Sequence, residues 1–164
     1  MQKKQPLKKL EIIQKKIFTR ENFSLQLAQW RFKDEKIVFT NGCFDILHQG
    51  HIHLLTGAAG FGTKLIVGVN SDNSVKKLKG QNRPLQDEKT RLLVMASLHF
   101  VDAVLLFEED TPYELIKLIQ PDVLVKGGDY KANEIVGAAL VKKVEIVNLL
   151  EGFSTTAIEM KMKS

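Results

Sequence analysis

The chain alternates short apolar runs with longer stretches of helical spacing. Five runs are apolar throughout and rich in β-branched residues, which is typical of buried strands; they span residues 36–41, 64–70, 101–107, 121–127 and 145–149. Helical patterns fill the gaps at residues 50–60, 87–99, 111–120 and 132–143, and a last helix is expected to open near Ser154. Strands that are apolar on both faces and separated by helices predict a doubly wound α/β fold with a five-stranded parallel sheet.

The first 35 residues have a different pattern. Apolar residues recur at helical spacing in two sets, Leu10, Ile13 and Ile17, then Phe23, Leu27 and Trp30. We therefore expect a helical extension over residues 1–35 and a single domain over residues 36–164. Within that domain, the sequence TPYE predicts Thr111 as the cap of the helix at 111–120, with Pro112 in its first position and Glu114 completing a capping box.

Composition narrows the class of partner. The net charge is +5 over 164 residues, but the lysines are spread out and no aromatic-rich basic stripe accompanies them, so small anions are favoured over nucleic acid. Cys43 is the only cysteine, which excludes an intrachain disulfide. No apolar run approaches the roughly 20 residues that span a bilayer, and the N-terminus lacks the apolar core of a signal peptide. We expect a cytoplasmic protein that does not bind membranes.

The strongest indication of chemistry is TNGCFDILHQGH, directly after the first strand of the domain. Ligands bind at the carboxyl ends of parallel strands, where Gly42 permits close approach of the backbone. His48 and His51 are three residues apart at a helix start and therefore share one face. Gly50 keeps the space between them free, and the helix N-terminus favours phosphate. Two imidazoles could also hold a metal, but no third ligand is evident nearby, so we expect no metal site in the protein.

Polar residues follow three later strands. Asn70 and Asp72 end the second strand, and Lys79 and Arg83 lie on a predicted Gly-punctuated loop, where cations can close over phosphates. Lys126 and Asp129 flank two glycines after the fourth strand, Lys126 toward phosphate and Asp129 toward a ribose hydroxyl. After the fifth strand, Ser154, Thr155 and Thr156 form a hydroxyl-rich helix start that suits phosphate.

These segments together resemble the cytidylyltransferase-like nucleotidyltransferases, over residues 36–158. The resemblance rests on FTNGCFDILHQGH, VGVNSDNSVKKLKGQNRP, FVDAVLLFEEDTPYELI, QPDVLVKGGDY and EGFSTTAI, in that order. Within the superfamily, NSD…LKG…RP and VKGGDY resemble the D-glycero-β-D-manno-heptose 1-phosphate adenylyltransferases. The resemblance implies the following roles: catalytic His48, His51 and Lys79; nucleotide-binding Thr40, Asn41, Gly42, Phe44, Asp45, Lys126, Gly128, Asp129, Ser154, Thr155 and Thr156; acceptor-binding Asn70, Asp72, Arg83 and Arg91.

The implied reaction moves AMP from ATP to heptose 1-phosphate, giving ADP-heptose and pyrophosphate, with Mg²⁺ arriving on the triphosphate. Two alternatives stay open: a cytidylyltransferase that uses CTP and glycerol 3-phosphate or a similar alcohol phosphate, and a non-catalytic nucleotide-binding regulator. Related chains carry a sugar kinase domain, so we expect a separate kinase upstream, and by analogy a homodimer. All of this requires the two imidazoles to share one crevice with the late serine-threonine cluster.

Overall fold

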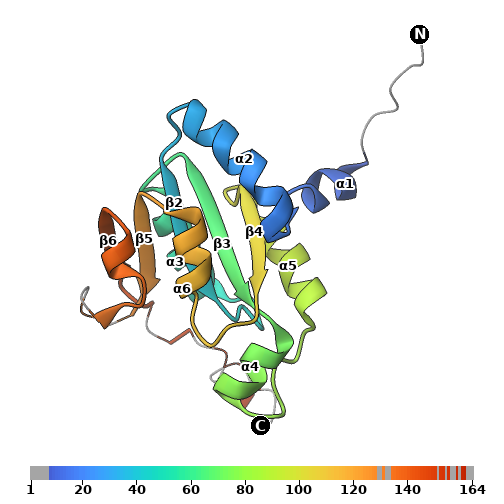
Figure 1. Ribbon diagram of the computed structural model, residues 1–164. Coiled ribbons are helices and arrows are strands. Elements are labelled where there is room, and N and C mark those ends of the chain that lie inside the picture. The colour runs from blue at the N-terminus through green and yellow to red at the C-terminus, as the bar shows by residue number, and fades with distance from the viewer. Residues whose placement is uncertain are drawn as a thin grey trace.

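The computed structural model describes residues 8–128, 131, 134–150, 152–153, 155, 158 and 160–161. Within this part of the chain, six parallel strands form one sheet in the order β1-β4-β3-β2-β5-β6 (Figure 1). The strands are β1 Ile17–Phe18, β2 Ile37–Gly42, β3 Lys64–Asn70, β4 Ala103–Phe107, β5 Val123–Gly127 and β6 Lys143–Val147.

Helices cover both faces of the sheet. They are α1 Lys9–Gln14, α2 Arg20–Phe32, α3 Gln49–Ala59, α4 Asp72–Lys79, α5 Glu88–Ser97, α6 Tyr113–Ile119 and the 3₁₀ helix η2 Ala138–Leu140. Buried residues of α2 and α6 belong to one core cluster, and those of α3 and α5 belong to a second cluster on the opposite face. In Figure 1, α6 lies across the front of the sheet and α4 lies beyond the carboxyl ends of β3 and β4.

The central strands are apolar throughout because helices cover both faces of the sheet. Phe39 and Ile66 pack into the cluster under α2 and α6, whereas their neighbours Val38 and Val67 pack into the cluster under α3 and α5. Successive side chains of a strand point to opposite faces, so a strand between two helical layers needs apolar residues throughout. The predicted doubly wound α/β fold is confirmed, and β3 has the limits expected for it.

The sheet has six strands where five were predicted. The sixth is β1, because the helix expected to include Ile17 ends at Gln14. Ile17 and Phe18 instead pair with Val104 and Leu105 along the free edge of β4. The next helix, α2, begins after Thr19, whose side chain accepts from the backbone N–H of Asn22 in a reciprocal capping box. Backbone pairing with the edge of β4 therefore decides the conformation of Ile17, although Leu10, Ile13 and Ile17 have helical spacing.

Three local predictions were wrong. Lys79, expected on a loop, is the last residue of α4, which begins at Asp72 because Ser71 accepts from the backbone N–H of Ser74 and caps the helix. Thr111 caps nothing: α6 starts at Tyr113, with Pro112 in the cap position and no side-chain cap. In place of a helix over 132–143, the described residues form η2 and then β6, which begins at Lys143. Ser154, where the last helix was expected to open, lies outside the described residues.

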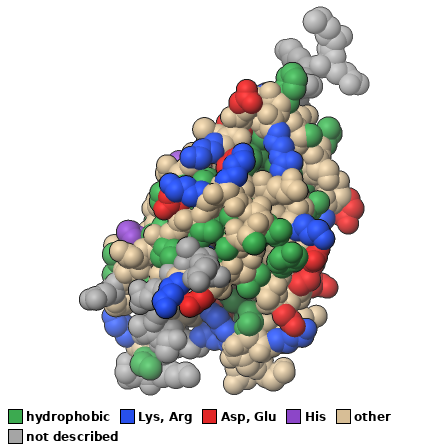
Figure 2. Space-filling model, turned by 60° about the vertical axis from the view of Figure 1, so that its left-hand side comes forward, with side chains coloured by type: hydrophobic (Ala, Val, Ile, Leu, Met, Phe, Trp, Pro, Cys, Tyr) green, Lys and Arg blue, Asp and Glu red, His purple; other side chains and the backbone are tan. Residues whose placement is uncertain are grey.

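None of the helices formed by the described residues has both the length and the apolar character needed to cross a bilayer. The positive charge is also distributed. On the face shown in Figure 2, Lys and Arg side chains are interspersed with acidic and apolar ones and do not gather into a single basic patch.

Candidate active site

The chain changes sides of the sheet between β2 and β5. The connection after β2 runs through α3 on one face, whereas η2, after β5, packs through Ala138 and Leu140 on the other face. Such a point opens a crevice at the carboxyl ends of the two strands. The Nζ of Lys126, at the end of β5, donates to Oδ1 of Asn41 in β2 and spans this point.

The two histidines lie together at the start of α3. His48 occupies the cap position and His51 the first turn; their rings stack with centroids 3.8 Å apart and planes 22° apart. The ring of Phe44 meets His51 edge-on at 5.3 Å between centroids. Nδ1 of both histidines is buried without a hydrogen-bond partner among the described residues, as is the Oγ1 of Thr40. Buried polar groups are usually paired, so three such atoms in one segment mark a place for a ligand.

Gly50 is required by this packing. A Cβ on Gly50 would lie 3.0 Å from Cε1 and 3.1 Å from Nδ1 of His48, and 3.3 Å from the carbonyl oxygen of Phe153. The residue that precedes Ser154 therefore lies against the HxGH turn. Thr155 is half-buried, and Ser154 and Thr156 lie outside the described residues. Gly42 likewise leaves space for the ring of Phe44, because a Cβ on Gly42 would lie 3.1 Å from that ring.

Burial favours the neutral form of both imidazoles. Burial, then the neighbouring His48 and the charge of Lys79, lower the pKa of His51 to about 4. Burial and then Lys79 also lower the pKa of His48. Lys79 is exposed and is the last residue of α4. Its position is therefore set by this helix and not by the predicted loop. The histidines can thus act as hydrogen-bonding groups while Lys79 supplies the positive charge.

Asp45 anchors the loop that leads into α5. Its buried side chain accepts from Arg83 at 2.7 Å and from the backbone N–H groups of Leu85 and Gln86 at 2.8 and 2.9 Å. Burial by itself would raise the pKa of Asp45, but the two amides and the Arg83 guanidinium hold that pKa below its ordinary value. The roles predicted for Asp45 toward nucleotide and for Arg83 toward acceptor stay predictions; the structure brings these two residues together.

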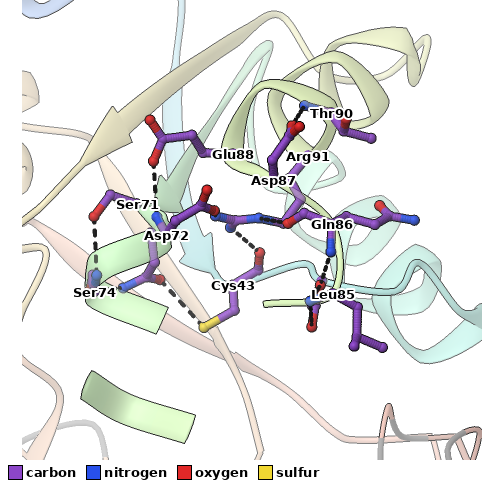
Figure 3. A network of polar contacts seen from close by, with 12 residues as sticks. Cys43, Ser71, Asp72, Ser74, Leu85, Gln86, Asp87, Glu88, Thr90 and Arg91 are labelled. Carbon is purple, nitrogen blue, oxygen red and sulfur yellow. Dashed lines mark hydrogen bonds and ion pairs between the residues drawn. The ribbon is translucent and has the colours of Figure 1, made fainter. Parts of the chain in front are cut away.

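Arg91 lies at the centre of a buried polar network (Figure 3). Its side chain is fully buried and donates to the carbonyls of Cys43 at 2.7 Å and Gln86 at 3.0 Å, and it pairs with Asp72 at 2.8 Å. The guanidinium therefore joins the loop after β2 to α4 and to the start of α5. These contacts give Arg91 a structural role within the chain, and its predicted role toward the acceptor stays a prediction.

Two further members of this network were not predicted. The Glu88 carboxylate accepts from the backbone N–H of Asp72 at 2.9 Å, and the Ser74 hydroxyl accepts from the buried Asn70 amide at 3.0 Å. Asn70 and Asp72, predicted to bind the acceptor, are thus committed to neighbouring side chains. Ser74 and Glu88 carry no motif of their own, and only the folded contact reveals them.

Three predicted site residues lie at or just after the end of β5: Lys126, Gly128 and Asp129. Among the described residues of this set, Lys126 is the one with a side-chain contact, its bond to Asn41. Burial lowers the pKa of Lys126 to about 8. The turn after it is tight: Gly128 has φ 125°, a conformation that favours glycine, and its N–H donates to the carbonyl of Val147 at 3.1 Å. Asp129 lies outside the described residues.

A family described as Cytidylyltransferase-like matches residues 39–161. The chain belongs to this family. Among curated relatives, it is similar to the bifunctional protein HldE of Wolinella succinogenes, with 52% identity over 92% of this chain, and to that of Nitratiruptor sp., with 57% identity over 80% of it. The chain spans about a third of the length of these relatives (32% and 29%). The predicted family is therefore confirmed, and with it the nucleotidyltransferase class.

Solved structures give the same family fold. The chain is 30% identical to the lipopolysaccharide core biosynthesis protein from Thermoplasma volcanium, with a TM-score of 0.59 over 71% of this chain and 97% of that one. The pantoate-beta-alanine ligase from Francisella tularensis, solved with β,γ-ATP and β-alanine, has a TM-score of 0.60 at 18% identity and shares the fold. In this cytidylyltransferase-like chain, the described residues contain no group of three or more His, Cys, Asp or Glu side chains arranged to hold a metal.

Proposed function

We propose that this chain transfers AMP from ATP to the phosphate of D-glycero-β-D-manno-heptose 1-phosphate, giving ADP-heptose and pyrophosphate. The observation that carries the proposal is the stacked pair His48 and His51, with a buried, unpartnered Nδ1 on each ring at the start of a helix. Free N–H groups at a helix start and two imidazoles suit the phosphates of a nucleotide. The chain's similarity to a lipopolysaccharide core biosynthesis protein supports a sugar phosphate as acceptor.

The reaction needs positioned charge and no covalent intermediate. An oxygen of the acceptor phosphate attacks the α-phosphorus of ATP, the bond from that phosphorus to the β-phosphate oxygen breaks, and pyrophosphate leaves on the opposite side. The acceptor oxygen is already anionic near pH 7, so no general base is required. His48, His51 and Lys79 stabilise the negative charge on the triphosphate, and Lys126 neutralises the phosphate on the β5 side.

The substrate is MgATP. Mg²⁺ keeps most of its ligands as phosphate oxygens and water in such complexes, which fits a site where the described residues offer imidazoles and amines around the phosphates. The chain's own residues bind and orient the nucleotide; the ion screens the charge of the triphosphate when it is bound.

The test is pyrophosphate release by the purified chain with ATP or CTP and a panel of acceptors that includes heptose 1-phosphate and glycerol 3-phosphate. We expect ATP with heptose 1-phosphate to be the best pair. His48→Ala and His51→Ala should each lower kcat about a hundredfold or more, the effect of losing one preorganised donor. His53→Ala is the matched control, because His53 is exposed on the same helix.

Each alternative has its own outcome. Preference for CTP with an alcohol phosphate would replace the proposal by a cytidylyltransferase. Nucleotide binding without pyrophosphate release on any acceptor would favour a regulator. Wild-type turnover by both histidine variants would overturn the assigned site.

The proposed reaction consumes a sugar 1-phosphate, and we propose that a separate sugar kinase acts upstream of it. We also propose that the chain works as a homodimer in the cytoplasm. The molar mass in solution tests the oligomeric state, since a monomer has a mass of 18.5 kDa.

A further inference from the structure

A second cavity adjoins the end of β5 on the α6 side of the sheet. It has a volume of about 320 Å³ and lies between α4, the loop before α6, β5 and residues 134–136. This volume is at the lower end of the roughly 300–1,000 Å³ range of small-molecule sites. It suits a monosaccharide better than a whole nucleotide.

The lining of the cavity matches the chemistry of a sugar. Leu78 and Val136 supply apolar surface, and the carboxylates of Asp110 and Glu134 supply acceptors. A sugar presents apolar C–H faces and a ring of hydroxyls that donate to carboxylates. Asp110 is partly engaged, because it pairs with Lys77 at 3.2 Å, so Glu134 is the better placed of the two for a hydroxyl.

Lys126 joins this cavity to the crevice. Its side chain lines the cavity and donates to Asn41 at the end of β2. His48 and His51 begin α3, which packs on the opposite face of the sheet from α6. In-line displacement requires the attacking and leaving oxygens on opposite sides of the α-phosphorus. With the histidines on the pyrophosphate side, an acceptor in the cavity would approach the crevice past Lys126, from the other face of the sheet.

We propose that this cavity holds the sugar of the acceptor, with Lys126 at its inner end on the acceptor phosphate and Glu134 on a sugar hydroxyl. The inference rests on the proposed function, and it locates the acceptor away from the buried Asn70 and Arg91 and from the partly exposed Asp72. The cavity is then a specificity site: it selects among sugar phosphates while the histidines bind any nucleoside triphosphate.

The experiment is steady-state pyrophosphate release with the full chain, varying ATP and heptose 1-phosphate separately. Glu134→Gln removes a charged hydrogen-bond acceptor and Val136→Trp fills the cavity. Each should raise the KM for heptose 1-phosphate about tenfold or more, the scale of one hydrogen bond to a charged group, and leave the KM for ATP unchanged. The matched controls are Glu114→Gln and Leu118→Trp, on exposed positions of α6 outside the cavity.

A second measurement, the discrimination between acceptors, separates loss of a specific contact from a general structural defect. Wild-type enzyme should discriminate between heptose 1-phosphate and its deoxy analogues, and Glu134→Gln should lose that discrimination for one hydroxyl. Unchanged acceptor KM in both cavity variants would overturn the inference, and so would a rise confined to the KM for ATP. Failure of the proposed function is distinct, because wild-type chain would then release no pyrophosphate from ATP and heptose 1-phosphate at all.

Discussion

Gly50→Ala is the sharpest test of the imidazole pair, because one methyl group reaches the site. The added Cβ would lie 3.0 and 3.1 Å from two ring atoms of His48 and 3.3 Å from the Phe153 carbonyl. Contacts this short require the neighbour to give by a few tenths of an ångström. The His48 ring has little freedom to do so, because His51 stacks on it at 3.8 Å.

The expected magnitude follows from the tolerance of a catalytic site. Reacting groups must be held within about 0.5 Å, and complete loss of one preorganised donor costs about 10²–10³ in kcat. A displaced but present imidazole should therefore cost about ten- to hundredfold, which is about 1.4–2.7 kcal/mol of barrier. Stability should not fall in parallel, because replacing glycine by alanine within a helix gains up to about 1 kcal/mol.

The assay pairs pyrophosphate release with thermal unfolding for Gly50→Ala and for Gly60→Ala. Gly60 ends the same helix with φ −67°, a conformation open to alanine, and a Cβ there meets only backbone atoms of the preceding turn. We expect the control to keep wild-type kcat. Full activity in Gly50→Ala, at wild-type Tm, would refute the argument that the space beside His48 is needed for catalysis.

Three further predictions concern the residues around this pair. Arg91→Ala should lower the free energy of unfolding by about 3–5 kcal/mol, because it leaves a carboxylate and two carbonyls without a donor. Urea denaturation measures this free energy. The control is Lys142→Ala, in an exposed pair, which should change the free energy of unfolding by less than about 1 kcal/mol. Asp45→Asn should cost about 3 kcal/mol at pH 7, whereas Asp110→Asn, in an exposed pair, should not. The folded pKa of Asp45 is below its ordinary value of 3.8, so this cost should shrink as the pH falls below 3.8 and wild-type Asp45 itself takes up a proton; an unchanged difference would contradict the ion pair. Lys126 is charged below its pKa of about 8 and neutral above it, so kcat/KM for heptose 1-phosphate should fall above about pH 8; Lys126→Arg, which stays charged, should flatten that profile, and a profile unaffected by the substitution would count against Lys126 as a phosphate ligand.

Five of the six strands were predictable because each satisfies a local rule, and β1 is the exception. Residues 64–70 form a short run that is mostly apolar, with valine and isoleucine at its centre, which favours a strand buried on both faces, and the sequence pattern and β3 coincide. The same reasoning gave a wrong prediction for the segment that contains Lys79, which forms α4. Three lysines and a following glycine suggest a loop, yet Ser71 caps a helix there and Ser74 and Val75 bury its inner face. A short helix of mixed polarity has too weak a pattern to be recognised without its packing partners.

Motif chemistry was determined by the sequence alone. The spacing of His48, Gly50 and His51 after an apolar strand fixes two imidazoles on one helix face at the carboxyl edge of the sheet, because strand and helix geometry are local. What the tertiary structure decided is which polar residues pair with each other. Arg91 is a residue type that binds phosphate, but in the folded chain it pairs with Asp72, and the two come together from α5 and α4 in a partly buried ion pair. Long-range contacts of this kind depend on how helices dock over the sheet, and a one-dimensional pattern does not record them.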